Sequence, residues 1–254
     1  MTHLFLEIAN WAARALAIPG VRGTWKYGSK RWRRRQFKKI FGREAQEHFL
    51  VFGTLEINPS IAQLLATLDQ QLSRFPFTKH GRPDMSFSAQ KVASSCELRA
   101  VAYIGPALSL DGDRTSRVFA DDSVEGKLDI DFISFGAMSN LMTVTAFANP
   151  ANQFVDYDRT LGFFASKKNG QRVCNVREGY DYGVILKIHP EQFPQRTWIV
   201  CAGVGEWGTS GSAWFLAHNW GSLAKKLKDS DQFACVIEVR PGQDESAVFR
   251  TLLS

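Results

Sequence analysis

A glycine-rich stretch at residues 203–212 is the part of the sequence whose residue types best suit ligand binding. It reads GVGEWGTSGS, contains the pattern GxGxxG, follows an apolar strand-like run and precedes a helical pattern. Glycines permit a tight turn and a close approach of the backbone to a ligand, and helix N-terminal amides favour phosphate or carboxylate. The candidate ligand-binding residues of this stretch are Gly203, Gly205, Trp207, Gly208, Thr209, Ser210 and Ser212.

Two features separate this stretch from the fingerprint of NAD-dependent dehydrogenases. That fingerprint places an acidic residue about 20 residues after the glycines, whereas the acid on the next predicted strand here is Glu238. Glu206 also lies inside the loop, where its charge repels an anion. The sequence therefore excludes a standard dehydrogenase, and it leaves open the alternative that the glycines only allow close packing of a helix on a strand.

A second loop of small residues, at 136–140, follows another predicted strand and contains Gly136, Ser139 and Asn140. In a parallel sheet the carboxyl ends of the strands face one edge, so both loops would border one ligand site. Ser139 also suits a helix cap, which is the alternative for that residue. Thr54, just after the first predicted strand, would border the same edge. Asp181 begins a predicted strand, so we expect it at the opposite edge.

The sequence contains little that is typical of a catalytic site. Glu206 is the best candidate acid or base, because a lone carboxylate beside Trp207 would have a raised pKa if it were buried. No nucleophile motif such as GxSxG is present, and the four cysteines lack metal-ligand spacing. We predict no metal site and a binding protein more readily than an enzyme. Cys96, Cys201 and Cys235 lie in apolar runs, as reduced core thiols of a cytoplasmic protein do.

The positive charge is concentrated at the N-terminal end. Residues 1–43 hold eleven Lys and Arg and one acidic residue, whereas the other residues carry a net charge of −4. An amphipathic helix predicted over 3–17 precedes the basic run, so this arm suits an anionic membrane surface, nucleic acid or an acidic protein. The remaining alternative is packing of the arm on the chain's own acidic body. The candidate contact residues are Arg31, Arg33, Arg34, Arg35, Lys38 and Lys39.

The elements that must position these residues alternate between strands and helices, which indicates an α/β domain. We predict a basic helical arm over 1–45, then a Rossmann-like domain over 46–254 with a mainly parallel sheet, helices on both faces and an antiparallel edge hairpin. The arm lies outside the alternating pattern, so we expect the body to fold without residues 1–43. The predicted strands cover 48–52, 128–135, 161–166, 171–176, 182–188, 197–202 and 233–239, and the predicted helices cover 59–74, 86–104 and 209–226.

From residue 129 onward the chain resembles bacterial Rossmann-like proteins. The residues that carry the resemblance are GAMSN at 136–140, DYG at 181–183 and AGVGEWGTSGSAWFL at 202–216. The resemblance implies a module that binds or senses a nucleotide-like or other small anionic ligand in bacterial signalling or defence. The alternatives are a nucleotide hydrolase or glycosidase with Glu206 as its acid or base, and a peripheral membrane or nucleic-acid adaptor that acts through the arm.

Overall fold

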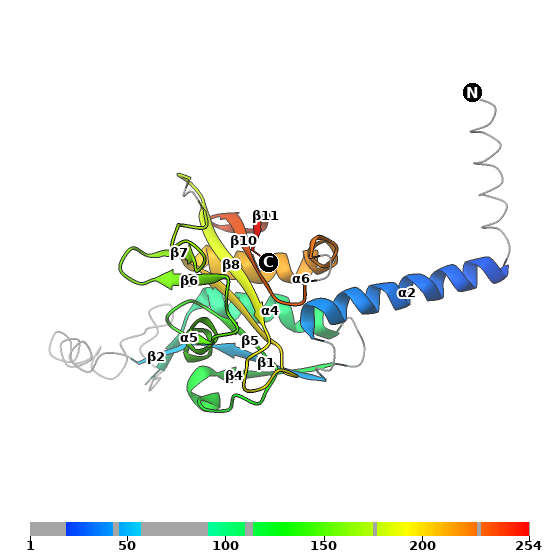
Figure 1. The fold of residues 1–254 in the computed structure, drawn as a ribbon, viewed down its shortest axis with the longest axis horizontal. Helices are drawn as coiled ribbons and strands as arrows, with labels where there is room; N and C mark the ends of the chain where they lie inside the picture. Colours follow the sequence, from blue (N-terminus) through cyan, green and yellow to red (C-terminus); the bar gives the residue numbers. More distant parts are fainter. Residues whose placement is uncertain are drawn as a thin grey trace, which may run out of the picture.

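The computed structural model describes residues 19–42, 46–56, 91–109, 114–174, 177–227 and 230–253. The helices predicted over 3–17 and 59–74 lie outside these residues. Within them, the α/β class is confirmed. A seven-stranded sheet forms the centre, and helices cover both of its faces (Figure 1).

The sheet is mixed, with strand order β11-β10-β8-β9-β5-β1-β4. Strands β4, β1, β5 and β9 are parallel to one another, whereas β8 is antiparallel to β9, and β10 is antiparallel to β8 and β11. The strands are β1 (Glu47–Phe52), β4 (Thr115–Ala120), β5 (Phe132–Phe135), β8 (Asp181–Ile188), β9 (Trp198–Gly203), β10 (Phe233–Arg240) and β11 (Gln243–Leu253).

One face of the sheet packs against three helices, and these are α2 (Pro19–Phe41), α4 (Ser95–Ser109) and α6 (Glu206–Lys226). The other face packs against α5 (Leu141–Ala148), the 3₁₀ helix η1 (Asp121–Val124) and the hairpin of β6 (Val155–Asp158) and β7 (Phe163–Ser166). Successive strand residues point to opposite faces. Accordingly, Leu50 and Ile133 join the α4–α6 core, while Val51 and Phe132 join the α5 core.

The central strands read as continuous apolar runs because both of their faces are covered. In β9 every residue is buried, and the run ends where Gly203 and Gly205 lead into α6. Cys96, Cys201 and Cys235 are buried free thiols, as predicted. Among the described helices, none combines the length and apolar character needed to cross a membrane.

Three predicted elements need correction. The predicted hairpin of 161–166 and 171–176 is reduced, among the described residues, to the antiparallel bridge Ala165–Arg172, and it does not extend the main sheet, because β7 pairs with β6 in a separate small sheet. The helix predicted over 86–104 begins at Ser95, after β3 (Lys91–Ala93), which pairs with β2 (Thr54–Glu56). Helix α6 begins at Glu206 and not at residue 209, so Gly208 lies inside it.

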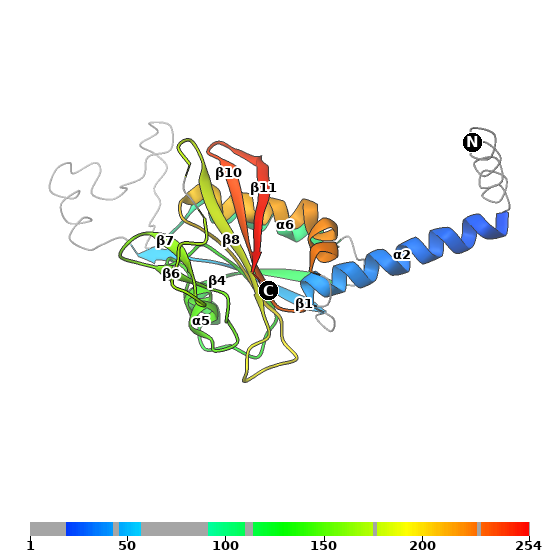
Figure 2. The same ribbon diagram turned by 45° about the horizontal axis from the view of Figure 1, so that its top comes forward.

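Helix α2 leaves the body and carries most of the basic run. Figures 1 and 2 show it projecting from the body, which it meets near its C-terminal end. It contains nine Lys and Arg and no acidic residue among its 23 residues, which at the usual rise gives a rod about 35 Å long.

Candidate functional site

The carboxyl ends of β4, β1, β5 and β9 meet at one edge of the sheet, together with the two loops predicted to bind a ligand. After β1 the chain turns towards α4 on one face, and after β5 it turns towards α5 on the other. The gap between β1 and β5 is therefore a topological switch point, where open α/β sheets bind ligands. Gly53, Gly136 and Ser139 border this point.

Glu97, in the first turn of α4, lies at the switch point and was not predicted from the sequence. Its carboxylate accepts hydrogen bonds from the Gly53 amide and, at 2.8 Å, from the Ser139 hydroxyl. The side chain is 1% exposed. Burial raises the pKa of Glu97 to about 7, and the nearby Asp121 carboxylate adds to the rise, while the two hydrogen bonds oppose it. A group with such a pKa exchanges protons near neutral pH.

The other polar residues of this edge hold the loops together. Asp121 accepts hydrogen bonds from the amide and hydroxyl of Thr54, both at 3.0 Å, and from the Leu141 amide at 2.9 Å. Asn140 caps α5 through the Met142 amide and donates to the carbonyls of Val51 and Phe135. These polar groups of Thr54 and Asn140 are thus engaged in hydrogen bonds within the protein. Gly136 has a φ of +91°, which favours glycine, and a Cβ there would collide with Glu97.

The amino end of α6 already holds a carboxylate, that of Asp181. Its two oxygens accept hydrogen bonds from the amides of Gly205 at 3.0 Å and Gly208 at 2.7 Å. A carboxylate at a helix N-terminus is stabilised in the same way as a bound phosphate. An anionic ligand at these amides would have to displace Asp181. Asp181 lies here because β8 is antiparallel, which corrects the expectation that it sits at the opposite edge.

The glycines of the 203–212 stretch let α6 lie directly on the sheet. A Cβ on Gly208 would lie 2.1 Å from the Tyr182 carbonyl oxygen, and a Cβ on Gly203 would lie 2.2 Å from the Thr209 amide. At Gly205 the added atom would meet Asp181 at 2.6 Å. Protein atoms fill these positions, so the glycines serve helix packing, the alternative that the sequence left open.

The remaining predicted residues of this stretch point away from the switch point or into the core. The Ser210 hydroxyl donates to Asp244 at 2.6 Å, and the Arg99 guanidinium lies 4.3 Å from the centre of the Trp207 ring. Thr209 and Ser212 are buried. Glu206 is exposed at the start of α6. Its proposed role as an acid or base depended on burial, which the structure does not show for this side chain. Within the described residues, no group of side chains is suited to hold a metal ion.

We expect Glu97 to make stability depend on pH. Its pKa in the folded protein lies above the ordinary value of 4.5, so folding takes up a proton between these values and stability falls as pH rises from 4.5 to about 7. Glu97→Gln replaces the titrating carboxyl group by an amide, whose oxygen can still accept the hydrogen bond from the Gly53 amide. The free energy of unfolding of the variant, relative to that of wild type, should therefore increase by about 3 kcal/mol between pH 4 and pH 8. Urea unfolding at each pH measures it.

The difference between variant and wild type isolates this group from His48. Burial lowers the pKa of His48 to about 4, so its contribution to stability is lost as pH falls below about 6.5, in the opposite direction. Glu178→Gln, at an exposed position, is the matched control and should show no such pH dependence. A constant difference across the range for Glu97→Gln would contradict the assignment.

The second candidate site is helix α2, whose C-terminal end is fixed to the body. Phe37, Ile40 and Phe41 are at most 2% exposed and belong to the main core. The last turns of α2, which the sequence analysis assigned to the arm of residues 1–45, therefore pack with the body. Phe37 meets Trp220 edge to face, with the ring centres 5.2 Å apart.

Buried basic residues of the body contact the last carbonyls of α2. Arg114 donates to the carbonyls of Phe41 at 3.0 Å and Gly42 at 2.6 Å. Lys187 donates to the Lys39 carbonyl at 2.8 Å, and the His48 Nε2 atom lies 2.7 Å from the Phe41 oxygen. Helix C-termini leave their carbonyls unpaired and carry partial negative charge, so these contacts stabilise the junction. Helix α2 is thus held in one direction.

The exposed part of α2 presents the predicted basic residues. Arg31, Arg33, Arg34, Arg35 and Lys38 are exposed, and Lys39 is half-buried. Arg31, Arg35 and Lys38 follow the spacing i, i+4, i+7, which places them on one stripe. The structure also places Lys225 over the ring of Trp32, which is 49% exposed. Trp32 thus contacts the body through Lys225 while remaining half exposed.

Two signals in the sequence could have revealed the residues that were missed. Residues 94–97 match a capping box, S-x-x-E, in which the glutamate bonds to the first residue of the motif. In the structure the Glu97 carboxylate instead accepts hydrogen bonds from Gly53 and Ser139. The short connection from β8 to β9 contains no helix. Parallel neighbours need a longer crossover, so this connection indicates the antiparallel pair that brings Asp181 to the site.

The resemblance to bacterial Rossmann-like proteins stays a prediction. Comparison of the chain with protein-family models, with curated proteins and with solved structures finds no match in any of the three.

Proposed function

We propose that this protein binds nucleic acid through the projecting helix α2. The observation that carries the proposal is the exposed stripe of Arg31, Arg35 and Lys38 on a helix whose end is fixed in the core. Because the body sets the direction of the helix, the cations are arranged before any partner arrives. Binding then loses less conformational freedom than it would with a loose basic tail.

The charge of α2 suits a phosphate backbone. The part of the helix before Phe37 is available to phosphates, because Phe37, Ile40 and Phe41 pack in the core. Contacts from Lys and Arg to phosphates release counterions, which supplies most of the free energy of non-specific binding. The proposed binding is therefore strongly dependent on salt and weakly dependent on sequence.

The contacts of residues 30–41 favour nucleic acid over a membrane surface for this part of α2. A helix that lies on a bilayer buries an apolar face among the lipids. Here the apolar residues Phe37, Ile40 and Phe41 face the body core, and the exposed residues from 30 to 35 are cationic except for Trp32. This part of the helix offers lipids charge without an apolar face.

A Rossmann-like arrangement is supported by the switch point between β1 and β5, with α4 and α5 on opposite faces. A small anionic ligand at the 203–212 stretch has less support, because Asp181 binds two of the helix amides and Glu206 adds a second negative charge. A hydrolase with Glu206 as its acid or base also has less support, since that side chain is exposed.

The test is a salt titration of binding by the full chain. We expect fluorescence anisotropy with a labelled oligonucleotide to give micromolar affinity at low salt and a plot of log K against log salt with a slope of about −3 or steeper, as three or more phosphate contacts require. Vesicles with and without anionic lipid are the comparison. Binding to anionic vesicles without binding to nucleic acid would overturn the proposal, as would affinity that is independent of salt.

A further inference from the structure

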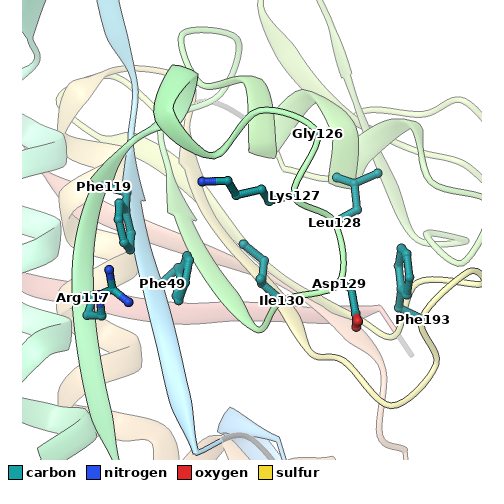
Figure 3. Close-up of a pocket in the computed structure, with 9 residues that line it drawn as sticks. All are labelled: Phe49, Arg117, Phe119, Gly126, Lys127, Leu128, Asp129, Ile130 and Phe193. Carbon is teal, nitrogen blue, oxygen red and sulfur yellow. The ribbon is translucent and has the colours of Figure 1, made fainter.

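An open groove of about 570 Å³ lies beside the edge strand β4, and neither the switch-point residues nor α2 contribute to its lining. It is formed by β1, β4, the 126–130 loop and Phe193 from the loop before β9 (Figure 3). Its volume falls within the usual range for small-ligand sites, about 300 to 1,000 Å³. The proposed function does not use this groove.

We propose that the groove holds an unpaired nucleotide of single-stranded nucleic acid whose neighbouring phosphates lie on α2. This inference rests on the proposed function and names its substrate class. It follows from three features, which are aromatic walls for a base, cations at one end for a phosphate, and a position next to the base of α2.

The walls suit a flat apolar ring. Phe49 and Phe119 are partly exposed and pack with ring centres 4.6 Å apart, and Ile130 continues their surface. Phe193, also partly exposed, lies at the opposite end of the groove in Figure 3. Unstacked bases bind to such aromatic surfaces in proteins that recognise single strands, and stacking tolerates any base.

The cations stand at one end of the groove. Figure 3 shows Arg117 and the Lys127 amine near the Phe119 end, whereas Asp129 lies towards Phe193. The Arg117 guanidinium lies 4.9 Å from the centre of the Phe119 ring, which holds it in place. The negative charge of Asp129 is offset by Arg196, whose Nε lies 2.7 Å from it. Arg117 is itself 3.9 Å from the Glu47 carboxylate, so a phosphate beside it would share that charge with Glu47, and Lys127 supplies the second positive group.

The groove and α2 share the amino end of β1. His48 contacts the last turn of α2 through the Phe41 carbonyl, and Phe49, the next residue, lines the groove. Successive residues of a strand are about 3.8 Å apart and point to opposite faces. The groove lies on the α5 face of the sheet and α2 packs on the opposite face, so a strand bound to α2 has to pass around edge strand β4 to place one base in the groove. A duplex cannot do so while its bases are paired.

The experiment compares single-stranded and duplex oligonucleotides of equal length with the full chain. We expect wild type to prefer the single strand by about 10-fold, the range that stacking of one base provides. Phe193→Ala and Lys127→Ala should each lower the affinity for the single strand about 5-fold and leave the affinity for duplex unchanged. Leu161→Ala and Lys168→Ala, at exposed positions outside the groove, are the matched controls. Thermal unfolding verifies that each variant is folded.

The outcomes separate the two proposals. If single-stranded and duplex oligonucleotides bind with equal affinity and the groove variants behave like wild type, the groove proposal is overturned and α2 remains the binding surface. Absence of binding to either form overturns both. Free AMP is the remaining probe. If the groove variants lose binding of AMP but keep the affinity for the oligonucleotide, the groove serves a free nucleotide and the inference fails.

Discussion

Replacing Arg31, Arg35 and Lys38 together by glutamine should lower the affinity for nucleic acid by two to three orders of magnitude at about 0.1 M salt. Each phosphate contact contributes about 0.9 to the slope of log K against log salt for duplex and about 0.7 for a single strand, so three lost contacts reduce the slope by about 2 to 3. The three side chains are exposed on one stripe of α2, and glutamine keeps good helix propensity. The fold should therefore be unaffected.

The measurement is fluorescence anisotropy across a range of salt concentrations, with circular dichroism to verify helix content. The matched control replaces Arg159, Lys168 and Arg172, three exposed cations beside the β6–β7 hairpin, by glutamine. Both triple variants change the net charge equally, so a general effect of charge would appear in both. An equal loss of affinity in the two variants would show that α2 is not the binding surface.

Deleting residues 1–43 should unfold the body, in contrast to what the sequence pattern suggested. The deletion removes Phe37, Ile40 and Phe41, all buried in the main core, and each buried apolar side chain contributes about 1.5 to 3 kcal/mol. It also removes the carbonyls of Phe41 and Lys39, to which the buried Arg114 and Lys187 donate, and losing hydrogen bonds from buried charged groups is costly. The sum approaches the whole stability of a typical domain, about 5 to 15 kcal/mol.

The matched control deletes residues 1–28 and keeps the anchored part of α2. We expect this variant to show a cooperative urea transition like that of the full chain, and the longer deletion to show none. If the protein without residues 1–43 unfolds with the midpoint of the full chain, the last turns of α2 are not part of the core. The pair of deletions thus locates the boundary that the sequence placed at residue 45.

Local patterns predicted much of the sheet. The apolar runs before Gly136 and Gly203 are β5 and β9, because a strand covered on both faces is apolar at most positions. Strand β11 was missed since QDESAVFRTLL mixes charged and apolar residues, which is usual for the last strand of a sheet with one exposed edge. The pairing of β7 with β6 was not predicted, because strand partners are chosen by packing and not by the nearest turn.

The sequence alone determined that this is an α/β protein with its positive charge at one end, since composition and periodicity are local properties of the chain. Only the tertiary structure decided what those residues do. It placed Asp181 on the amides that suggested an anion site, buried Glu97 against Gly53, and buried Phe37 while leaving Arg35 exposed. These outcomes depend on contacts between segments far apart in the chain, so no local pattern contains them.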